Sequence, residues 1–193
     1  MIQPTYFTSD LHLSHENIIK YSRRPFSNAK HMNESLIENF NNTVPPNAIT
    51  YIVGDVSFDK DIGNTISMLN QLNGKLVLIS GNHDRRNLKI EGFRKCFSSI
   101  HELIDIKIDT YDITLCHYAL LTWNKSHRGA LMLHGHSHGS LKDDPNALRI
   151  DVGVDCHNYT PISFTQVKDI MSKKTWAPID HHGADLWHLY EMS

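Results

Sequence analysis

Leu131–Gly139 reads Leu-Met-Leu-His-Gly-His-Ser-His-Gly, and this segment decides how the rest of the chain is interpreted. An apolar run ends there in two histidines, His136 and His138, which stand one residue apart between glycines. In an extended backbone, residues i and i+2 point to the same side, so both imidazoles can face one small volume. Imidazole is the commonest metal-binding side chain, and the next question is whether other ligands converge there.

The composition is that of one domain spanning residues 1–193. Of these residues, 40% are hydrophobic, which is enough for a substantial core, and the formal net charge of −2 argues against a strongly basic nucleic-acid-binding face. The three cysteines are odd in number and far apart, which excludes a disulfide framework and favours a reducing compartment. No segment has the pattern of a signal peptide or a membrane span. We therefore expect a cytoplasmic protein with no membrane association.

Five predicted strands are followed by polar residues of one chemical kind. The apolar runs are Thr5–Ser9, Ile49–Val53, Lys75–Ser80, Ile113–Cys116 and Ala130–Leu133. The residues that follow them are Asp10 and His12, Asp55, Asn82 and His83, His117, and finally His136 and His138. Strands alternate with helices in the first half of the chain, which predicts a largely parallel sheet with its binding cleft at the carboxyl ends of the strands.

The remaining pattern completes an α/β chain. Further strands are predicted over His101–Asp109 and Leu148–Val154. Helices are predicted from a cap at Ser14, over Asn33–Phe40, along the Ile62 to Leu72 stripe, over Asn87–Phe97, and from Pro161 with Ser163 and Gln166 as a capping box. The tail from about residue 173, which contains Trp176, His181, His182 and Trp187, receives no assignment.

The gathered side chains suit two metal ions. Two carboxylates, one amide and four imidazoles are too many ligands for one tetrahedral zinc. Oxygen and imidazole ligands favour manganese, with iron, zinc, nickel or magnesium as alternatives, over copper or a structural zinc. Two such ions can clamp the oxygens of an in-line phosphoryl displacement and lower the pKa of a water between them. The pattern therefore predicts a hydrolase of phosphate esters.

The same residues, in this order, resemble the calcineurin-like metallophosphoesterase superfamily. The motifs stand here as Asp10-Leu11-His12, Gly54-Asp55, Gly81-Asn82-His83-Asp84, His117 and Gly135-His136-Ser137-His138. The run is similar to the small, cap-less members of bacteria and bacteriophages. The resemblance implies two mixed β-sheets packed face to face with helices outside, an α/β/β/α arrangement.

The resemblance also implies a role for each motif residue. Asp10, His12 and His138 would hold one metal, Asn82, His117 and His136 the other, and Asp55 would bridge them. A metal-bridging hydroxide would attack phosphorus in line. His83 would contact the phosphate and protonate the leaving oxygen, and Asp84 would orient that imidazole.

Residues on the substrate side are less well defined by the sequence. Arg85 and Arg128 are ranked above Arg23 and Arg24 as phosphate contacts, and the latter two are more often a solvated pair. Trp123 and Tyr118 can stack on a substrate ring, and equally they can cover the core. His134 is expected to pack rather than to bind a metal.

We expect a phosphodiesterase, rather than a phosphomonoesterase, that acts on a small ester such as a nucleotide, without an obligatory protein partner. A nucleotidase or a nuclease is the alternative enzyme. Two non-enzyme alternatives stay open: a catalytically silent scaffold of the same fold, and a histidine-rich metal store.

Overall fold

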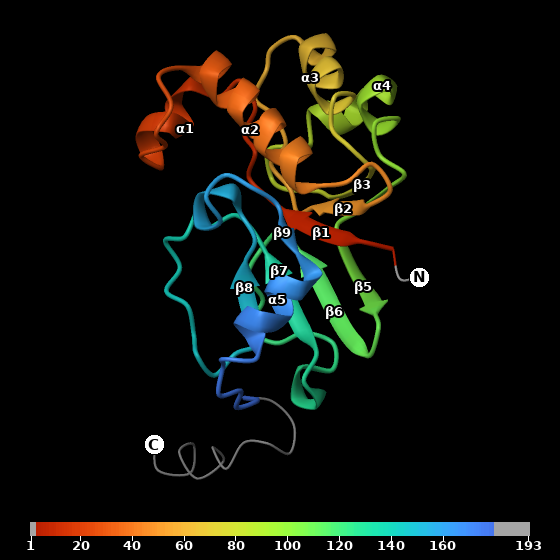
Figure 1. Cartoon of the computed structure of the whole chain (residues 1–193), viewed down its shortest axis with the longest axis vertical. Helices are drawn as coiled ribbons and strands as arrows, with labels where there is room; N and C mark the ends of the chain where they lie inside the picture. The colour runs from red at the N-terminus through yellow and green to blue at the C-terminus, as the bar shows by residue number, and fades with distance from the viewer. Residues whose placement is uncertain (1–2, 180–193) are drawn as a thin grey trace.

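The computed structural model describes residues 3–179, which form two β-sheets packed face to face (Figure 1). In the first sheet, β1 (Thr5–Thr8), β2 (Ile49–Ile52), β3 (Lys75–Ile79) and β4 (Ser99–His101) run parallel, and β9 (Ile162–Ser163) pairs antiparallel with β1. In the second sheet, β5 (Leu103–Ile108) is antiparallel to β6 (Tyr111–Cys116), which is followed in parallel by β7 (Leu131–His134) and β8 (Arg149–Asp151).

The helices divide between the two sides of the first sheet. The outer side carries α1 (Glu16–Tyr21), α2 (Ala29–Thr43), α3 (Ile62–Leu69) and α4 (Glu91–Arg94), as Figure 1 shows. The last helix, α5 (Phe164–Met171), joins the core between the sheets through Phe164, Val167 and Met171. Short 3-10 turns lie at Asn87–Lys89, Ser126–Arg128 and Val154–Cys156.

Strand β3 contributes side chains to two hydrophobic cores, one between the first sheet and its helices and one between the two sheets. Leu76 and Leu78 pack with the helices, whereas Val77 and Ile79 pack with the second sheet. Side chains alternate between the faces of a strand, so this strand is apolar throughout because both of its faces are buried. The sheet edge that carries the polar residues is thus held rigidly from two sides.

The expected fold class, two mixed β-sheets with helices, is confirmed, and several element boundaries are corrected. The strand predicted over His101–Asp109 is two strands, because the chain leaves the first sheet after His101 and enters the second at Leu103. Helix α2 begins at Ala29, where the Asn28 side chain accepts a hydrogen bond from the His31 amide. The helix predicted over Asn87–Phe97 is broken into a 3-10 turn and α4.

Two helix starts were predicted from capping residues, with opposite outcomes. The capping box of Ser163 and Gln166 is present at α5. Ser14 does not cap α1, whose cap residue is His15; the Ser14 hydroxyl instead donates to Asp59.

Part of the unassigned tail can now be placed. The amides of Thr175 and Ala177 donate to the carbonyls of Pro145 and Asn146, which ties this segment to the loop before β8. His181, His182 and Trp187 lie outside the described residues. Among the residues that the structure describes, no helix is long and apolar enough to cross a membrane.

Candidate metal centre

The carboxyl ends of β1, β2, β3, β6 and β7 bring the expected ligands to one edge of the sandwich. Backbone hydrogen bonds connect the loops that leave these strands: the Asp10 amide donates to Gly54 O at 3.0 Å, the His12 amide to Asp55 O at 3.0 Å, and the Gly135 amide to His117 O at 3.0 Å. The relative positions of the ligand-bearing loops are therefore fixed by main-chain contacts.

Most of these ligand positions have a left-handed backbone. The φ angles are 57° at Asp10, 49° at His12, 56° at Asp55, 69° at His136 and 48° at His138. The argument that an extended backbone aligns residues i and i+2 is therefore wrong for His136 and His138, and it does not apply to Asp10 and His12 either. Non-glycine residues adopt this conformation at a cost, and such residues concentrate at functional sites.

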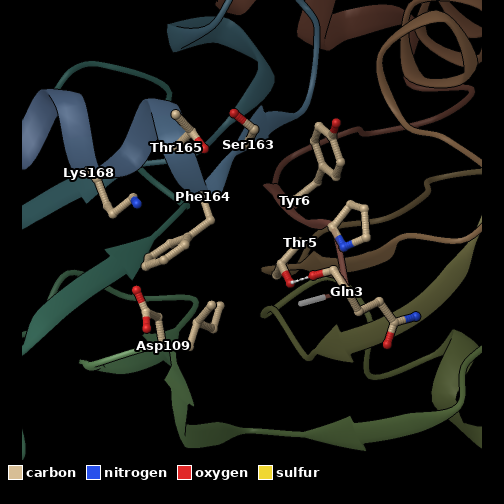
Figure 2. Close-up of a pocket in the computed structure, with 10 residues that line it drawn as sticks. Gln3, Thr5, Tyr6, Asp109, Ser163, Phe164, Thr165 and Lys168 are labelled. Atoms are coloured by element: carbon tan, nitrogen blue, oxygen red, sulfur yellow. Dashed lines mark hydrogen bonds between the residues drawn. The ribbon is translucent and has the colours of Figure 1, made fainter. Parts of the chain in front are cut away.

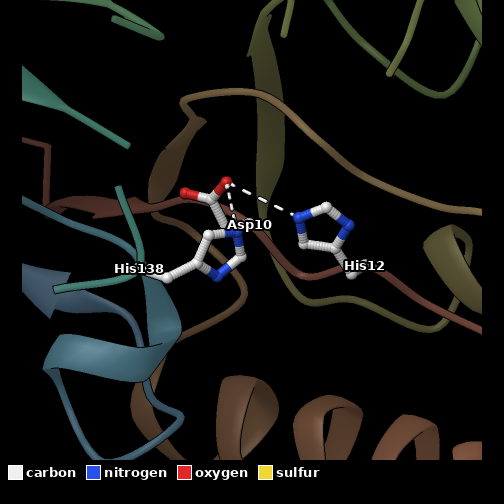
Figure 3. A group of neighbouring side chains, drawn as sticks. All are labelled: Asp10, His12 and His138. Atoms are coloured by element: carbon white, nitrogen blue, oxygen red, sulfur yellow. Dashed lines mark ion pairs between the residues drawn. The ribbon is translucent and has the colours of Figure 1, made fainter. Parts of the chain in front are cut away.

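The first ligand group consists of Asp10, His12 and His138 (Figure 3). Their ligand atoms all lie within 4.8 Å of one another. Oδ1 of Asp10 is 3.7 Å from Nε2 of His12 and 3.6 Å from Nε2 of His138. Figure 3 shows both imidazoles turned toward the same carboxylate, which reaches them from the end of β1.

This group fits a metal ion because it leaves buried polar atoms without partners. Asp10 is 0% exposed and His12 is 3% exposed. Oδ1 of Asp10 and both ring nitrogens of His12 have no hydrogen-bond partner among the described residues. A buried polar atom without a partner is costly, and a cation between these atoms would satisfy them together.

The second group consists of Asp55, His117 and His136, whose ligand atoms also lie within 4.8 Å of one another. Nε2 of His117 is 3.5 Å from Oδ2 of Asp55 and 3.0 Å from Oδ1 of Asn82. Oδ2 of Asp55 is also 3.7 Å from Nε2 of His12. One carboxylate oxygen therefore faces both groups, as a bridging ligand would.

The electrostatics of the second group reflect its pairing. Burial alone would lower the pKa of His117, but its hydrogen bonds to Asp55 and to the Val53 carbonyl raise it to about 9. Burial would raise the pKa of Asp55, but the His117 imidazole lowers it to about 2. A histidine binds a metal ion as a neutral imidazole, so an ion that binds here replaces the proton on Nε2 of His117. The hydrogen bond from Nδ1 to Val53 O keeps the tautomer that leaves Nε2 free for the ion.

His83 lies at the mouth of this site rather than within a ligand group. Its side chain is 45% exposed, and Nε2 is 3.9 Å from Oδ2 of Asp55. Its amide donates to Oδ1 of Asp55 at 3.0 Å, which fixes the backbone beneath the imidazole. This position suits a group that meets a substrate.

Asp84 has partners other than the one expected from the sequence. Its buried carboxylate accepts hydrogen bonds from the amides of Asp55, Val56 and Gly81 at 2.8–2.9 Å, instead of contacting the His83 imidazole. The role of Asp84 is therefore to join the loops after β2 and β3, and it holds Asp55 in place through the backbone.

Sequence reasoning missed an ion pair beneath the first group. Arg24 was expected as a solvated side chain or a phosphate contact, but its side chain is 0% exposed and pairs with Asp155 through Nε and Nη2, both at 2.8 Å. Arg24 also donates to the carbonyls of Asp10 and Leu11, at 2.7 and 3.0 Å. Asp155 in turn lies 2.7 Å from Nδ1 of His138. The pair therefore connects the Asp10 loop to the His138 imidazole.

The other candidates lie outside the two ligand groups. Arg85 and Arg128 are exposed, and their contact with phosphate stays a prediction. Trp123 donates to Ala130 O and lines a hollow with Trp176 in which none of the expected ligands takes part, so it packs against the tail. Tyr118 is exposed and lies edge-on to His136, with ring centroids 4.7 Å apart. His134 is buried and bonds to Gly135 O.

A separate hollow of about 250 Å³ lies at the opposite end of β1 (Figure 2). Thr5, Tyr6, Asp109, Phe164 and Lys168 are among the residues that line it, and none of the expected ligands is. It is larger than a single-ion site, but it has no convergent set of ligand atoms. The candidate functional site is therefore the edge at the carboxyl ends of the strands.

Comparison with known proteins gives one family and several relatives. The model for calcineurin-like phosphoesterases matches residues 4–185 of this chain. An uncharacterized protein of Methanocaldococcus jannaschii is 34% identical over 174 residues, covering 87% of this chain and 91% of that protein. The gene 66 protein of Mycobacterium phage L5 is 24% identical, covering 78% of this chain and 86% of the phage protein.

A solved structure supports the fold alone. A protein of unknown function from Aquifex aeolicus superposes on this chain with a TM-score of 0.67 at 22% sequence identity. The superposition covers 87% of this chain and 99% of the other.

Proposed function

This chain belongs to the calcineurin-like phosphoesterase family, and we propose that it hydrolyses a phosphodiester with the help of two divalent metal ions. The observation that carries the proposal is the position of Asp55, whose Oδ2 lies 3.7 Å from His12, 3.5 Å from His117 and 3.9 Å from His83. One carboxylate thus faces both ligand groups and the exposed imidazole. That arrangement suits a pair of ions with a proton donor beside them.

Each ligand group would hold one ion, with Asp55 shared between them. Asp10, His12 and His138 would take one ion, and Asn82, His117 and His136 the other. When bound, the ions would polarise a phosphoryl oxygen and lower the pKa of the attacking water. Mixed oxygen and nitrogen ligands favour Mn²⁺ among the candidates.

The proton for the leaving group would come from His83. Its imidazolium donates a hydrogen bond from Nε2 to a phosphate oxygen in the ground state. As the ester bond to phosphorus breaks, the same proton passes to the leaving oxygen. Two contacts hold the imidazole in position for this transfer. The backbone amide of His83 donates a hydrogen bond to Asp55, and the His83 ring contacts Phe58 at 4.5 Å between centroids.

A diester is favoured over a monoester by the openness of the site. His83, which lies outside the ligand groups, and His136, a proposed ligand of the second ion, are both exposed. Exposure at these two places leaves room for a phosphate that carries two substituents. The same openness would admit a nucleotide or a nucleic-acid end, but the net charge of −2 provides little attraction for a polyanion. We propose the cytoplasm as the compartment, where widely spaced thiols stay reduced.

Hydrolysis assays on metal-loaded protein test the proposal. Wild type should cleave bis(p-nitrophenyl) phosphate faster than p-nitrophenyl phosphate with added Mn²⁺. His83→Ala should lower kcat by about 10²- to 10⁴-fold, the usual contribution of a general acid, while it keeps the bound metal. His31→Ala removes an exposed histidine of α2 and should change neither quantity.

The alternatives predict different results. An inactive wild type that holds two equivalents of metal would support a silent scaffold and overturn the proposal. Graded uptake of many equivalents without hydrolysis would instead indicate a metal store.

A further inference from the structure

A row of three aromatic side chains extends from His83 toward solvent. The Phe58 ring lies 4.5 Å from the His83 ring, centroid to centroid. The His15 imidazole stacks on Phe58 at 3.9 Å and 11°, and Tyr21 meets His15 edge-on at 6.5 Å. We call Phe58, His15 and Tyr21 the aromatic row.

The aromatic row becomes more accessible with distance from the proton donor. Phe58 and His15 are half-buried, whereas the Tyr21 side chain is 74% exposed. The two inner rings are brought together by different loops, His15 from the segment after β1 and Phe58 from the segment after β2. Their stacked geometry presents a continuous aromatic border on the His83 side of the site.

The position of this border relative to His83 gives it a chemical meaning. If His83 protonates the leaving oxygen, the substituent on that oxygen extends away from phosphorus past the His83 imidazole. The first surface that such a substituent meets is Phe58, followed by His15 and Tyr21. An alkyl chain would gain little there, whereas a flat ring can stack on or against these side chains.

We propose that the aromatic row binds the planar ring of the leaving alcohol, and that the preferred substrates are therefore esters of nucleosides or aryl alcohols. This inference rests on the proposed function, because it assigns the leaving side from His83. Among the described residues, one exposed tyrosine, Tyr118, has ring contacts with His117 and His136 of the second ligand group. The second substituent of a diester is accordingly less tightly selected.

Competitive inhibition isolates the contribution of the ring. Adenosine monophosphate carries adenine where ribose 5-phosphate carries its anomeric hydroxyl, so the ratio of their inhibition constants measures the effect of the ring. The reporter reaction is the hydrolysis of bis(p-nitrophenyl) phosphate by Mn²⁺-loaded protein. We expect adenosine monophosphate to bind wild type about tenfold more tightly, a magnitude typical of base stacking on aromatic side chains.

Two variants test whether this preference arises from the row. Phe58→Leu and Tyr21→Ala should each reduce the ratio, Phe58→Leu toward one. Tyr111→Ala is the matched control, because Tyr111 is an exposed tyrosine that packs on Phe164 at the opposite end of the second sheet. Phe58 touches His12 and His83, so a change at Tyr21, which is largely exposed, guards against an indirect effect on the metal site.

The possible results distinguish a failure of the ring-binding role of the aromatic row from a failure of the proposed phosphoesterase activity. A wild-type ratio near one, or a ratio that neither variant changes, overturns the role of the row and leaves the phosphoesterase activity standing. Failure of wild type to hydrolyse the reporter with any divalent metal overturns the proposed function itself, and the inference with it.

Discussion

Replacing Asp155 with asparagine should weaken the metal site of Asp10, His12 and His138 and spare the other site. The carboxylate lies 2.7 Å from Nδ1 of His138 and accepts two hydrogen bonds from Arg24 at 2.8 Å. Asparagine has nearly the same shape as aspartate, but an amide NH2 group replaces one carboxylate oxygen and cannot accept a hydrogen bond. With the amide nitrogen in place of Oδ1, Nε of Arg24 loses its acceptor, and with the amide nitrogen in place of Oδ2, both Nη2 of Arg24 and Nδ1 of His138 lose theirs.

The size of both effects follows from these contacts. Removing the outer partner of a metal-binding histidine lowers metal affinity by about 10- to 100-fold, or roughly 1.4–2.7 kcal/mol. The lost hydrogen bond to a charged group should lower the free energy of unfolding by about 1.5–3 kcal/mol. Water cannot replace the missing partner, because the Arg24 side chain is fully buried.

Calorimetric titration of metal-free protein with Mn²⁺ would resolve the two sites, and denaturant unfolding would give the stability. The control is Asp112→Asn, which removes one partner of the half-exposed ion pair to Lys125, 3.0 Å long. Such pairs contribute little, so we expect a stability change below about 1 kcal/mol and unchanged metal binding. If Asp155→Asn bound both metal ions with the affinity of wild type, or bound both more weakly by the same factor, the role of Asp155 in orienting His138 would be refuted.

Three further changes test other parts of the site. His136→Ala and His138→Ala should each lower the affinity for a different ion, visible as loss of different steps in the same titration; loss of one common step would contradict the two groups. Gly135→Ala should prevent metal binding or folding, since a Cβ there would overlap the Ser9 hydroxyl, whereas Gly92→Ala meets only a flexible Ile66 methyl at 3.0 Å and should be tolerated. Metal addition should raise the melting temperature of wild type, because it satisfies buried atoms that otherwise lack partners, and an unchanged melting temperature with metal bound would contradict that account.

Local patterns carried most of what the sequence could predict. Apolar runs followed at once by Asp10, Asp55, Asn82, His117 and His136 needed no knowledge of distant contacts, and the structure does bring these strand ends to one edge. The change of sheet at Glu102 escaped notice, because the alternation along Leu103–Ile108 gives no sign that His101 pairs in another sheet. Nothing in the local pattern marks the residue at which a chain changes sheets.

Long-range polar contacts were beyond the reach of sequence patterns. Asp155 lies 131 positions after Arg24, and neither residue belongs to a motif. Arg24 stands in an Arg-Arg-Pro segment that is typical of a solvated loop, yet its partners come from two separate parts of the chain, residues 10–11 and Asp155. The partners of Asp84 were misjudged for a related reason: every residue except proline has a backbone N–H, so the sequence does not indicate which of them a carboxylate will bind.

Five ligand residues have a left-handed backbone, so the residues that supply the ligand atoms lower the stability of the folded protein. Each such residue costs about 1–3 kcal/mol relative to a relaxed conformation, a cost that glycine would avoid. At an exposed position such as His136, with φ of 69°, exchange for glycine removes a ligand and also relieves strain. Mutational drift without selection for metal binding would therefore move toward a more stable and inactive protein. The histidines and aspartates at these positions supply ligand atoms at the expense of stability.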